Sequence, residues 1–343
     1  MAEARGAYWD ARLETIPRDE LRQVQRAWLE WQLRRCWDGA PFYRARLEAA
    51  GIDPDDGVSF EQLAPLAPLT PAELVAEQAA HPPFGRLAVA SPAAWRQVFP
   101  IGTDPRQRWR SVWTEADSYN VAAHAARLLW QCGVRPGDRV VSGFAPESAS
   151  AAALRGGVTR LEAVLVVPPL GWLPARLDAF APAALVAPAL ALSGSAAARA
   201  SSASARPSCI GLLAGLGGLA DPGARSALEA ALCLRVFDCY GLQPAPPSEP
   251  LGLPIAAECE VRAGLHLVED QYLVEVLDPD SGVPLADGDE GVLVVTTLTR
   301  EATPLVRLWT GDRGRLDPSP CPCGRTTARL VGGVRPHAAP GAA

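Results

Sequence analysis

The chain has 343 residues, of which 48% are hydrophobic and 20% are charged, and its net charge is -6. This size and apolar share predict two or three structural units around a substantial buried core. Acidic and basic residues are interspersed, which excludes the basic face of a nucleic-acid-binding protein. No apolar run is long enough to span a bilayer, and the start lacks a secretory signal, so we expect a cytoplasmic protein without membrane contact.

The cysteines and the basic residues limit which kinds of site the chain can form. Eight cysteines in a chain of this size do not indicate a disulfide scaffold. Five of them have apolar neighbours and are predicted to be buried core thiols: Cys36, Cys132, Cys209, Cys233 and Cys239. All 32 basic residues are arginines. The chain therefore supplies no lysine for a Schiff base, a Walker loop or an adenylation reaction.

Residues 1–94 are predicted to form a helical N-terminal region. Apolar side chains recur at helical spacing over residues 18–50, and Pro41 interrupts the pattern. We assign Trp28 and Trp31, which lie on this segment, to the core rather than to a ligand cage.

Residues 95–240 are predicted to form an α/β core. Alternating helices and strands indicate a mostly parallel sheet flanked by helices. The predicted elements are helices at 117–132 and 148–160, and strands at 139–142, 163–167 and from Leu185. His124 lies on the first helix, where an isolated histidine is more typical of packing than of catalysis. Residues 193–208 are rich in Ala and Ser and are predicted to be a loop.

A glycine-rich turn at residues 215–220 follows a predicted strand and precedes a helix that begins at Pro222. With Asp238 about 20 positions further on, it matches the G-x-G-x-x-A dinucleotide fingerprint. Such short patterns recur by chance, and this one lies late in the chain. An NAD-dependent enzyme is therefore a hypothesis that rests on this pattern alone.

Residues 241–335 are predicted to form a β-rich subdomain. Two β-branched runs, 273–277 and 292–298, are separated by acidic turns and indicate a hairpin or meander. The acidic turns lack the spacing of an EF-hand, so we assign them to turn formation and not to calcium.

Four potential zinc ligands bracket this subdomain. Cys259 and His266 form a C-x6-H pair, and Cys321 and Cys323 form a C-x-C pair followed by Gly324. A structural Zn²⁺ takes four nitrogen or sulfur donors in a tetrahedron, and two short pairs far apart in sequence can fix two loops at one point. Four unrelated residues are the alternative, but both pairs occur together. We predict a structural zinc site, whose full donor set leaves no open position for catalysis.

Seven short segments between residues 258 and 325 form a recognisable set. They are Glu258-Cys259-Glu260, Gly264-Leu265-His266, Glu269-Asp270, residues 296–302, Pro304-Leu305-Val306-Arg307, Thr310-Gly311-Asp312 and Cys321-x-Cys323-Gly324-Arg325. In this order they resemble phenylacetate-CoA ligases, the aryl-acid-activating members of the adenylate-forming superfamily. The resemblance implies the α/β N-terminal domain of such an enzyme, ending in the zinc-bearing subdomain.

The resemblance also implies a nucleotide site. The positions that match the family's ATP-binding motifs are Gly102, Thr103, Arg106, Tyr240, Gly241 and Asp312. Asp312 would hold the ribose hydroxyls of ATP, and its alternative role is to cap a turn. Phe144 and Tyr240 would bound the pocket for an aromatic acid.

Several family features are altered. Asp104 adds negative charge to the phosphate loop, and Pro105 removes a backbone donor. Leu242-Gln243-Pro244 replaces the segment that carries the magnesium carboxylate, unless Glu249 reaches the site, and Leu216 replaces an acidic residue. The chain stops near the family's hinge, before its lysine-bearing C-terminal domain. Each lost contact costs about 3 to 4 kcal/mol of transition-state stabilisation, which argues against efficient use of Mg-ATP.

Two further hypotheses follow. In the first, an atypical ligase homologue acts on an aromatic carboxylic acid or its activated acyl thioester in specialised biosynthesis. In the second, an ATP-independent catalyst or non-catalytic binding protein reuses the same site. Both allow a partner protein or a homodimer.

Overall fold

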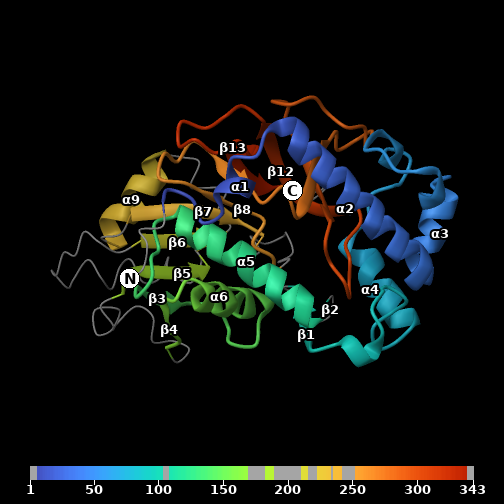
Figure 1. Ribbon diagram of the computed structural model, residues 1–343, viewed down its shortest axis with the longest axis horizontal. Helices are drawn as coiled ribbons and strands as arrows, with labels where there is room; N and C mark the ends of the chain where they lie inside the picture. Colours follow the sequence, from blue (N-terminus) through green and yellow to red (C-terminus); the bar gives the residue numbers. More distant parts are fainter. Residues whose placement is uncertain are drawn as a thin grey trace, which may run out of the picture.

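The computed structural model describes residues 6–102, 108–168, 182–188, 210–214, 222–232, 235–241 and 252–337 (Figure 1). Several predicted features lie outside these ranges: Thr103 and Arg106, the loop at 193–208, the glycine-rich turn at 215–220, the segment 242–249, Cys209 and Cys233. Within the described residues, no helix is both long and apolar enough to cross a membrane.

The N-terminal region is helical, as predicted. Its helices are α1 (Ala11–Glu14), α2 (Arg18–Gly39), α3 (Pro41–Ala49) and α4 (Pro71–Ala80), with 3-10 turns at Pro54–Asp56, Glu61–Leu63 and Pro92–Ala94. The predicted helical span is divided at Ala40, because Pro41, at the first position of α3, has no backbone N–H to continue α2. Trp28 is 38% exposed on α2, so its assignment to the core was wrong.

A two-stranded hairpin follows this region. β1 (Gln97–Ile101) pairs antiparallel with β2 (Trp109–Trp113). The alternating helix and strand pattern did not predict this hairpin.

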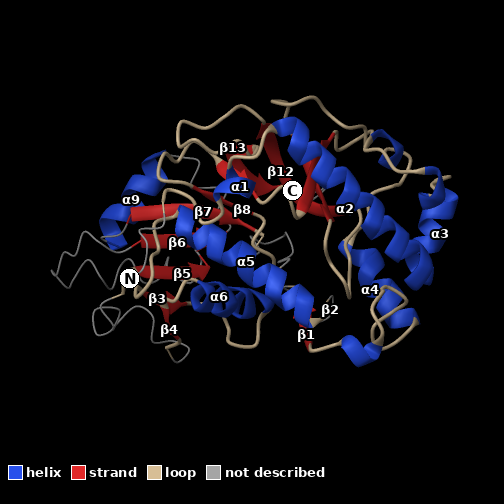
Figure 2. Cartoon of the chain, in the orientation of Figure 1, coloured by secondary structure: helices blue, strands red, loops and turns tan. Residues whose placement is uncertain are grey.

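The α/β core confirms the predicted parallel arrangement. Its elements are α5 (Glu115–Gln131), β3 (Arg139–Ser142), α6 (Ala149–Arg160), β4 (Val164–Val166), β5 (Ala184–Pro188), β6 (Ile210–Ala214), α9 (Pro222–Leu232) and β7 (Arg235–Tyr240). The parallel strands lie in the order β7-β6-β5-β3-β4. Helices α5 and α6 lie side by side over these strands (Figure 2). Gly157 permits this close packing, since a Cβ there would lie 2.7 Å from the Cβ of Ala125.

The β-rich region continues the same sheet. Its strands are β8 (Ala256–Glu258), β9 (Leu265–Leu267), β10 (Tyr272–Leu277), β11 (Gly291–Thr297), β12 (Leu308–Asp317) and β13 (Arg329–Pro336). β8 pairs antiparallel with β7, which gives an 11-stranded sheet in the order β10-β11-β12-β13-β9-β8-β7-β6-β5-β3-β4. The predicted hairpin is present as β10 and β11, with Leu273 opposite Thr296.

Arg307 fastens the N-terminal region to this sheet. Its side chain is fully buried, and its guanidinium donates to the backbone carbonyls of Leu63, Ala64 and Leu66. The same guanidinium forms two hydrogen bonds, of 3.1 and 3.0 Å, with the carboxylate of Glu275 on β10. The Arg307 guanidinium therefore supplies hydrogen-bond donors both to the backbone carbonyls of the N-terminal region and to a carboxylate on the edge strand β10.

Candidate metal centre and nucleotide-binding edge

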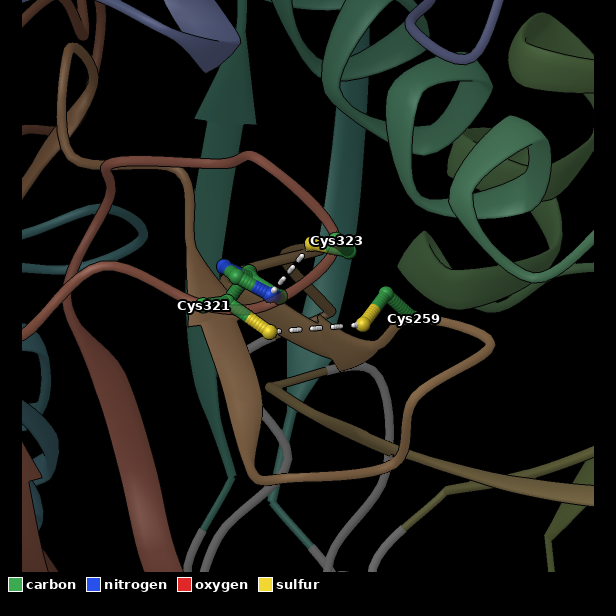
Figure 3. A group of neighbouring side chains, drawn as sticks. Cys259, Cys321 and Cys323 are labelled. Atoms are coloured by element: carbon green, nitrogen blue, oxygen red, sulfur yellow. Dashed lines mark hydrogen bonds between the residues drawn. The ribbon is translucent and has the colours of Figure 1, made fainter.

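The four predicted zinc ligands meet in space. Cys259 follows β8, His266 lies on β9, and Cys321 and Cys323 lie between β12 and β13. One ligand atom from each residue lies within 4.8 Å of all the others. Figure 3 shows the sulfurs of Cys259 and Cys321 pointing toward each other, with Cys323 directed into the same space. One strand and two loops therefore supply one donor set.

The spacing of these donors fits a tetrahedral zinc ion. With Zn–S bonds of about 2.3 Å and a Zn–N bond of about 2.05 Å, the edges of the tetrahedron are about 3.8 Å between sulfurs and about 3.6 Å between sulfur and nitrogen. The Sγ atoms of Cys259 and Cys321 are 3.9 Å apart, and Sγ of Cys323 is 3.5 Å from Nε2 of His266. A Cys₃His set of this size suits Zn²⁺.

The surroundings orient the donors. Nδ1 of His266 lies 3.2 Å from the hydroxyl of Thr327, which leaves Nε2 to face the sulfurs. Arg325 donates a hydrogen bond of 3.6 Å to Sγ of Cys323 and places a positive charge beside it. A Zn²⁺ ion bound by three thiolates would carry a net charge of -1, which the guanidinium would balance.

The two thiols affect each other's pKa. A hydrogen bond with Cys259 is the main reason why the pKa of Cys323 is lowered, and His266 acts in the same direction against the effect of burial. The same thiol–thiol bond, together with burial, raises the pKa of Cys259. Because metal-bound cysteines are thiolates, metal binding at this site would release protons.

A second group of predicted residues lies at the end of β7 and in the middle of β12. The hydroxyl of Tyr240 donates a hydrogen bond of 2.9 Å to Oδ2 of Asp312, and both side chains are buried. Burial raises the pKa of Tyr240, and the neighbouring carboxylate of Asp312 adds to this effect. Gly241 has a φ of +95°, and a Cβ there would lie 2.3 Å from the carbonyl oxygen of Leu253, so only glycine fits.

The predicted pocket residues lie at the carboxyl ends of the parallel strands, along one side of the sheet. Phe144 follows β3 and Tyr240 ends β7, so both lie at the carboxyl ends of parallel strands. β5 and β6 lie between these strands, which separates the two residues by three strand spacings, or about 14 Å. They border the same edge without touching. Gly102 lies after β1, and its carbonyl accepts a hydrogen bond from Arg108.

The sequence did not reveal two residues beside the metal centre. Thr327 and Arg325 contact ligand side chains directly. Arg325 belongs to the Cys321-x-Cys323-Gly324-Arg325 segment, which was the available signal. No signal in the sequence pointed to Thr327, because its contact with His266 exists only in the folded chain.

Comparison with known proteins identifies the family to which the chain belongs. Phenylacetate-coenzyme A ligase of Thermus thermophilus is 34% identical over 328 residues, which cover 93% of this chain and 71% of that protein. The Escherichia coli enzyme of the same name is 31% identical over 337 residues, covering 93% of this chain and 72% of that protein. The chain belongs to the phenylacetate-coenzyme A ligase family. No family model matches the sequence.

Solved structures agree with this assignment. A 2-hydroxyisobutyryl-CoA ligase in its postadenylation state superimposes with a TM-score of 0.87 and 27% identity, covering 98% of this chain and 72% of that one. The same ligase in an open conformation, in complex with 2-HIB-AMP and CoA, gives a TM-score of 0.86 at 29% identity, covering 98% of this chain and 79% of that one. The α/β fold of the adenylate-forming CoA ligases is therefore shown for the chain, and an acyl-CoA ligase-like function is supported.

Proposed function

We propose that the chain binds an aromatic carboxylic acid, or its activated acyl form, at the carboxyl edge of the parallel strands between Phe144 and Tyr240. The nucleotide, ATP, would bind beside Asp312. The observation that carries this proposal is the contact between Tyr240 and Asp312, because it joins the retained Tyr-Gly pair of one family motif to the intact Thr-Gly-Asp motif.

Asp312 supplies a buried carboxylate at this edge. A carboxylate accepts hydrogen bonds from vicinal hydroxyls, and the phenol of Tyr240 already occupies one of its oxygens. We propose that Asp312 accepts hydrogen bonds from the two ribose hydroxyls of ATP. ATP would then activate the acid as an acyl adenylate with release of pyrophosphate.

We propose that this step is slow with the chain alone. The sequence contains no lysine to stabilise the charge that develops during adenylation, and one such contact contributes about 3 to 4 kcal/mol. Mg-ATP would therefore bind, but its conversion to the acyl adenylate would be slow. A preformed acyl thioester, used in specialised biosynthesis, is the substrate that avoids this step.

We propose that Cys259, His266, Cys321 and Cys323 hold a structural Zn²⁺. The donor spacing and the orientation of His266 support this assignment. All four positions of the ion are then filled by the protein, so the zinc would stabilise the fold and leave the reaction to other residues. Elemental analysis should find close to one zinc per chain.

The test is a search for the acyl adenylate. The protein is incubated with Mg-ATP and either phenylacetate, benzoate or 2-hydroxyisobutyrate, and mass spectrometry follows the adenylates. We expect slow adenylate formation with the aryl acids that is lost in Asp312→Asn. Aryl-acid binding without any effect of ATP would instead favour an ATP-independent binding protein. Failure to bind any aryl acid or its thioester contradicts the proposed substrate class.

A further inference from the structure

The segment that precedes α2 lies against the metal centre. Residues 7–16, the N-terminal strap, include α1 and contact residues 321–326, the metal loop. Thr326 donates through its backbone N–H to the carbonyl of Glu14 (3.1 Å) and through its hydroxyl to the carbonyl of Ile16 (2.6 Å). The hydroxyl of Tyr8 donates to the carbonyl of Cys323 (3.2 Å). The strap thus bonds to the backbone of a metal ligand.

Arg325 joins the strap to the metal ligands. Its guanidinium pairs with the carboxylate of Glu14 at 2.6 Å, and the two side chains are only 5% and 2% exposed. It also donates to the carbonyl of Ala7 and to Sγ of Cys323. A single buried cation therefore balances a metal-bound sulfur on one side and the strap on the other. Removal of either partner would leave a buried charge uncompensated.

The fit between the two segments is close. Gly324 has a φ of +89°, and a Cβ there would lie 2.2 Å from the hydroxyl of Tyr8. The guanidinium of Arg325 lies over the ring of Tyr8 at 5.1 Å. On its other side, the strap stacks Trp9 against Trp130 of α5, with ring centroids 5.7 Å apart. The strap therefore packs against the metal loop on one side and against α5 on the other.

We propose that the metal centre is a latch that holds the N-terminal strap closed. This inference rests on the proposed zinc site and assigns it a conformational role. α1 is only four residues long, which is too short to be stable by itself, so the strap depends on its contacts. Zinc fixes Cys321 and Cys323 at one point and thereby fixes the loop that receives the strap. Loss of zinc frees the loop and opens the strap.

Coupling of this kind is reciprocal. If zinc stabilises the closed strap, the closed strap must stabilise zinc by the same factor. Weakening the strap without touching a ligand should therefore weaken zinc binding. This consequence separates a latch from a zinc ion that merely stabilises its own loop.

Hydrogen exchange of the full chain tests the first direction. The zinc-loaded protein and the protein stripped with a chelator are compared, with α3 and α4 as internal references. We expect exchange over residues 7–16 to rise at least about tenfold on zinc removal, in the range typical of coupled sites, while α3 and α4 stay protected. Unchanged exchange in the strap of a protein shown by elemental analysis to have lost its zinc overturns the latch and leaves the zinc site standing. A protein that takes up no zinc overturns both.

The reverse direction uses the zinc-loaded protein and needs no stripped state. Glu14→Gln removes the charge that pairs with Arg325, and Tyr8→Phe removes the hydrogen bond to Cys323. Arg12→Gln changes an exposed charge on the same helix and is the matched control. We expect the affinity for zinc, measured at equilibrium by competition with a chromophoric chelator, to fall about 5- to 50-fold in the first two variants and to be unchanged in the third. Equal affinities in all three would contradict the latch.

Discussion

The hydroxyl of Tyr240, at the end of β7, donates a hydrogen bond of 2.9 Å to Oδ2 of Asp312 on β12. The two residues are 72 positions apart in sequence, and three strands, β13, β9 and β8, lie between β12 and β7 in the sheet. The contact therefore joins a strand of the parallel part to a strand of the antiparallel part. It brings together the two family motifs on which the proposed nucleotide site depends.

Thr327 is expected to control zinc affinity through His266. Thr327→Val keeps the shape of the side chain but removes the hydroxyl that lies 3.2 Å from Nδ1. The ring then loses the partner that orients it, and zinc affinity should fall about 10- to 100-fold. Competition with a chelator of known affinity measures the change. Thr159→Val, at an exposed position on α6, is the control and should leave zinc affinity unaltered.

Arg307 is expected to be essential for stability. Arg307→Met leaves Glu275 and three carbonyls without their donor, which should lower the free energy of unfolding by about 3 to 5 kcal/mol. Urea denaturation gives this value. Arg44→Met breaks an exposed pair with Glu48 and should cost no more than about 0.5 kcal/mol. A loss below about 1 kcal/mol in Arg307→Met would show that the buried clamp is dispensable.

His124 is expected to make the fold sensitive to mild acid. Burial lowers the pKa of His124 to about 3; nearby Arg127 and Arg300 add to this effect, while Asp270 opposes it. The ordinary pKa of the unfolded side chain is about 6.5. As the pH falls from about 6.5 toward 3, the unfolded chain takes up a proton that the folded chain does not. Stability should therefore fall by up to about 1.4 kcal/mol per pH unit in this window.

The variant His124→Gln isolates this contribution. Glutamine keeps an acceptor for the hydroxyl of Tyr272, which lies 3.3 Å from Nδ1, and does not titrate. Between pH 6.5 and 4.5 the variant should lose about 2.5 kcal/mol less stability than the parent protein, as measured by urea unfolding at each pH. Parallel losses in both proteins would mean that His124 is not held neutral.

Local patterns in the sequence predicted much of the fold. The alternation around α5, β3 and α6 identified the parallel sheet, since apolar spacing reflects burial directly. The C-x6-H and C-x-C pairs identified the four residues that meet at the metal centre, because ligand type and spacing are local. Buried Cys36, Cys132 and Cys239 confirm the expected core thiols.

Long-range contacts could not be predicted in this way. Tyr8 and Glu14 precede the metal loop by more than 300 positions, and nothing in their own neighbourhood indicates that they bond to it. Trp28 lies at a helical spacing typical of the core, yet its face of α2 is partly left to solvent. The β1–β2 hairpin was not predicted, because Pro100 lies within β1 and a proline inside a short apolar run argues against a strand.

Calorimetric titration with Mg-ATP tests the central claim most directly. The parent protein, Asp312→Asn and the exposed-turn control Asp280→Asn are compared; asparagine at 312 still accepts the hydrogen bond from Tyr240 but removes the charge. We expect binding at about micromolar strength, or about -8 kcal/mol, that survives in Asp280→Asn and is lost in Asp312→Asn. Equal binding by all three proteins, or no binding by the parent, would contradict a nucleotide site at Asp312.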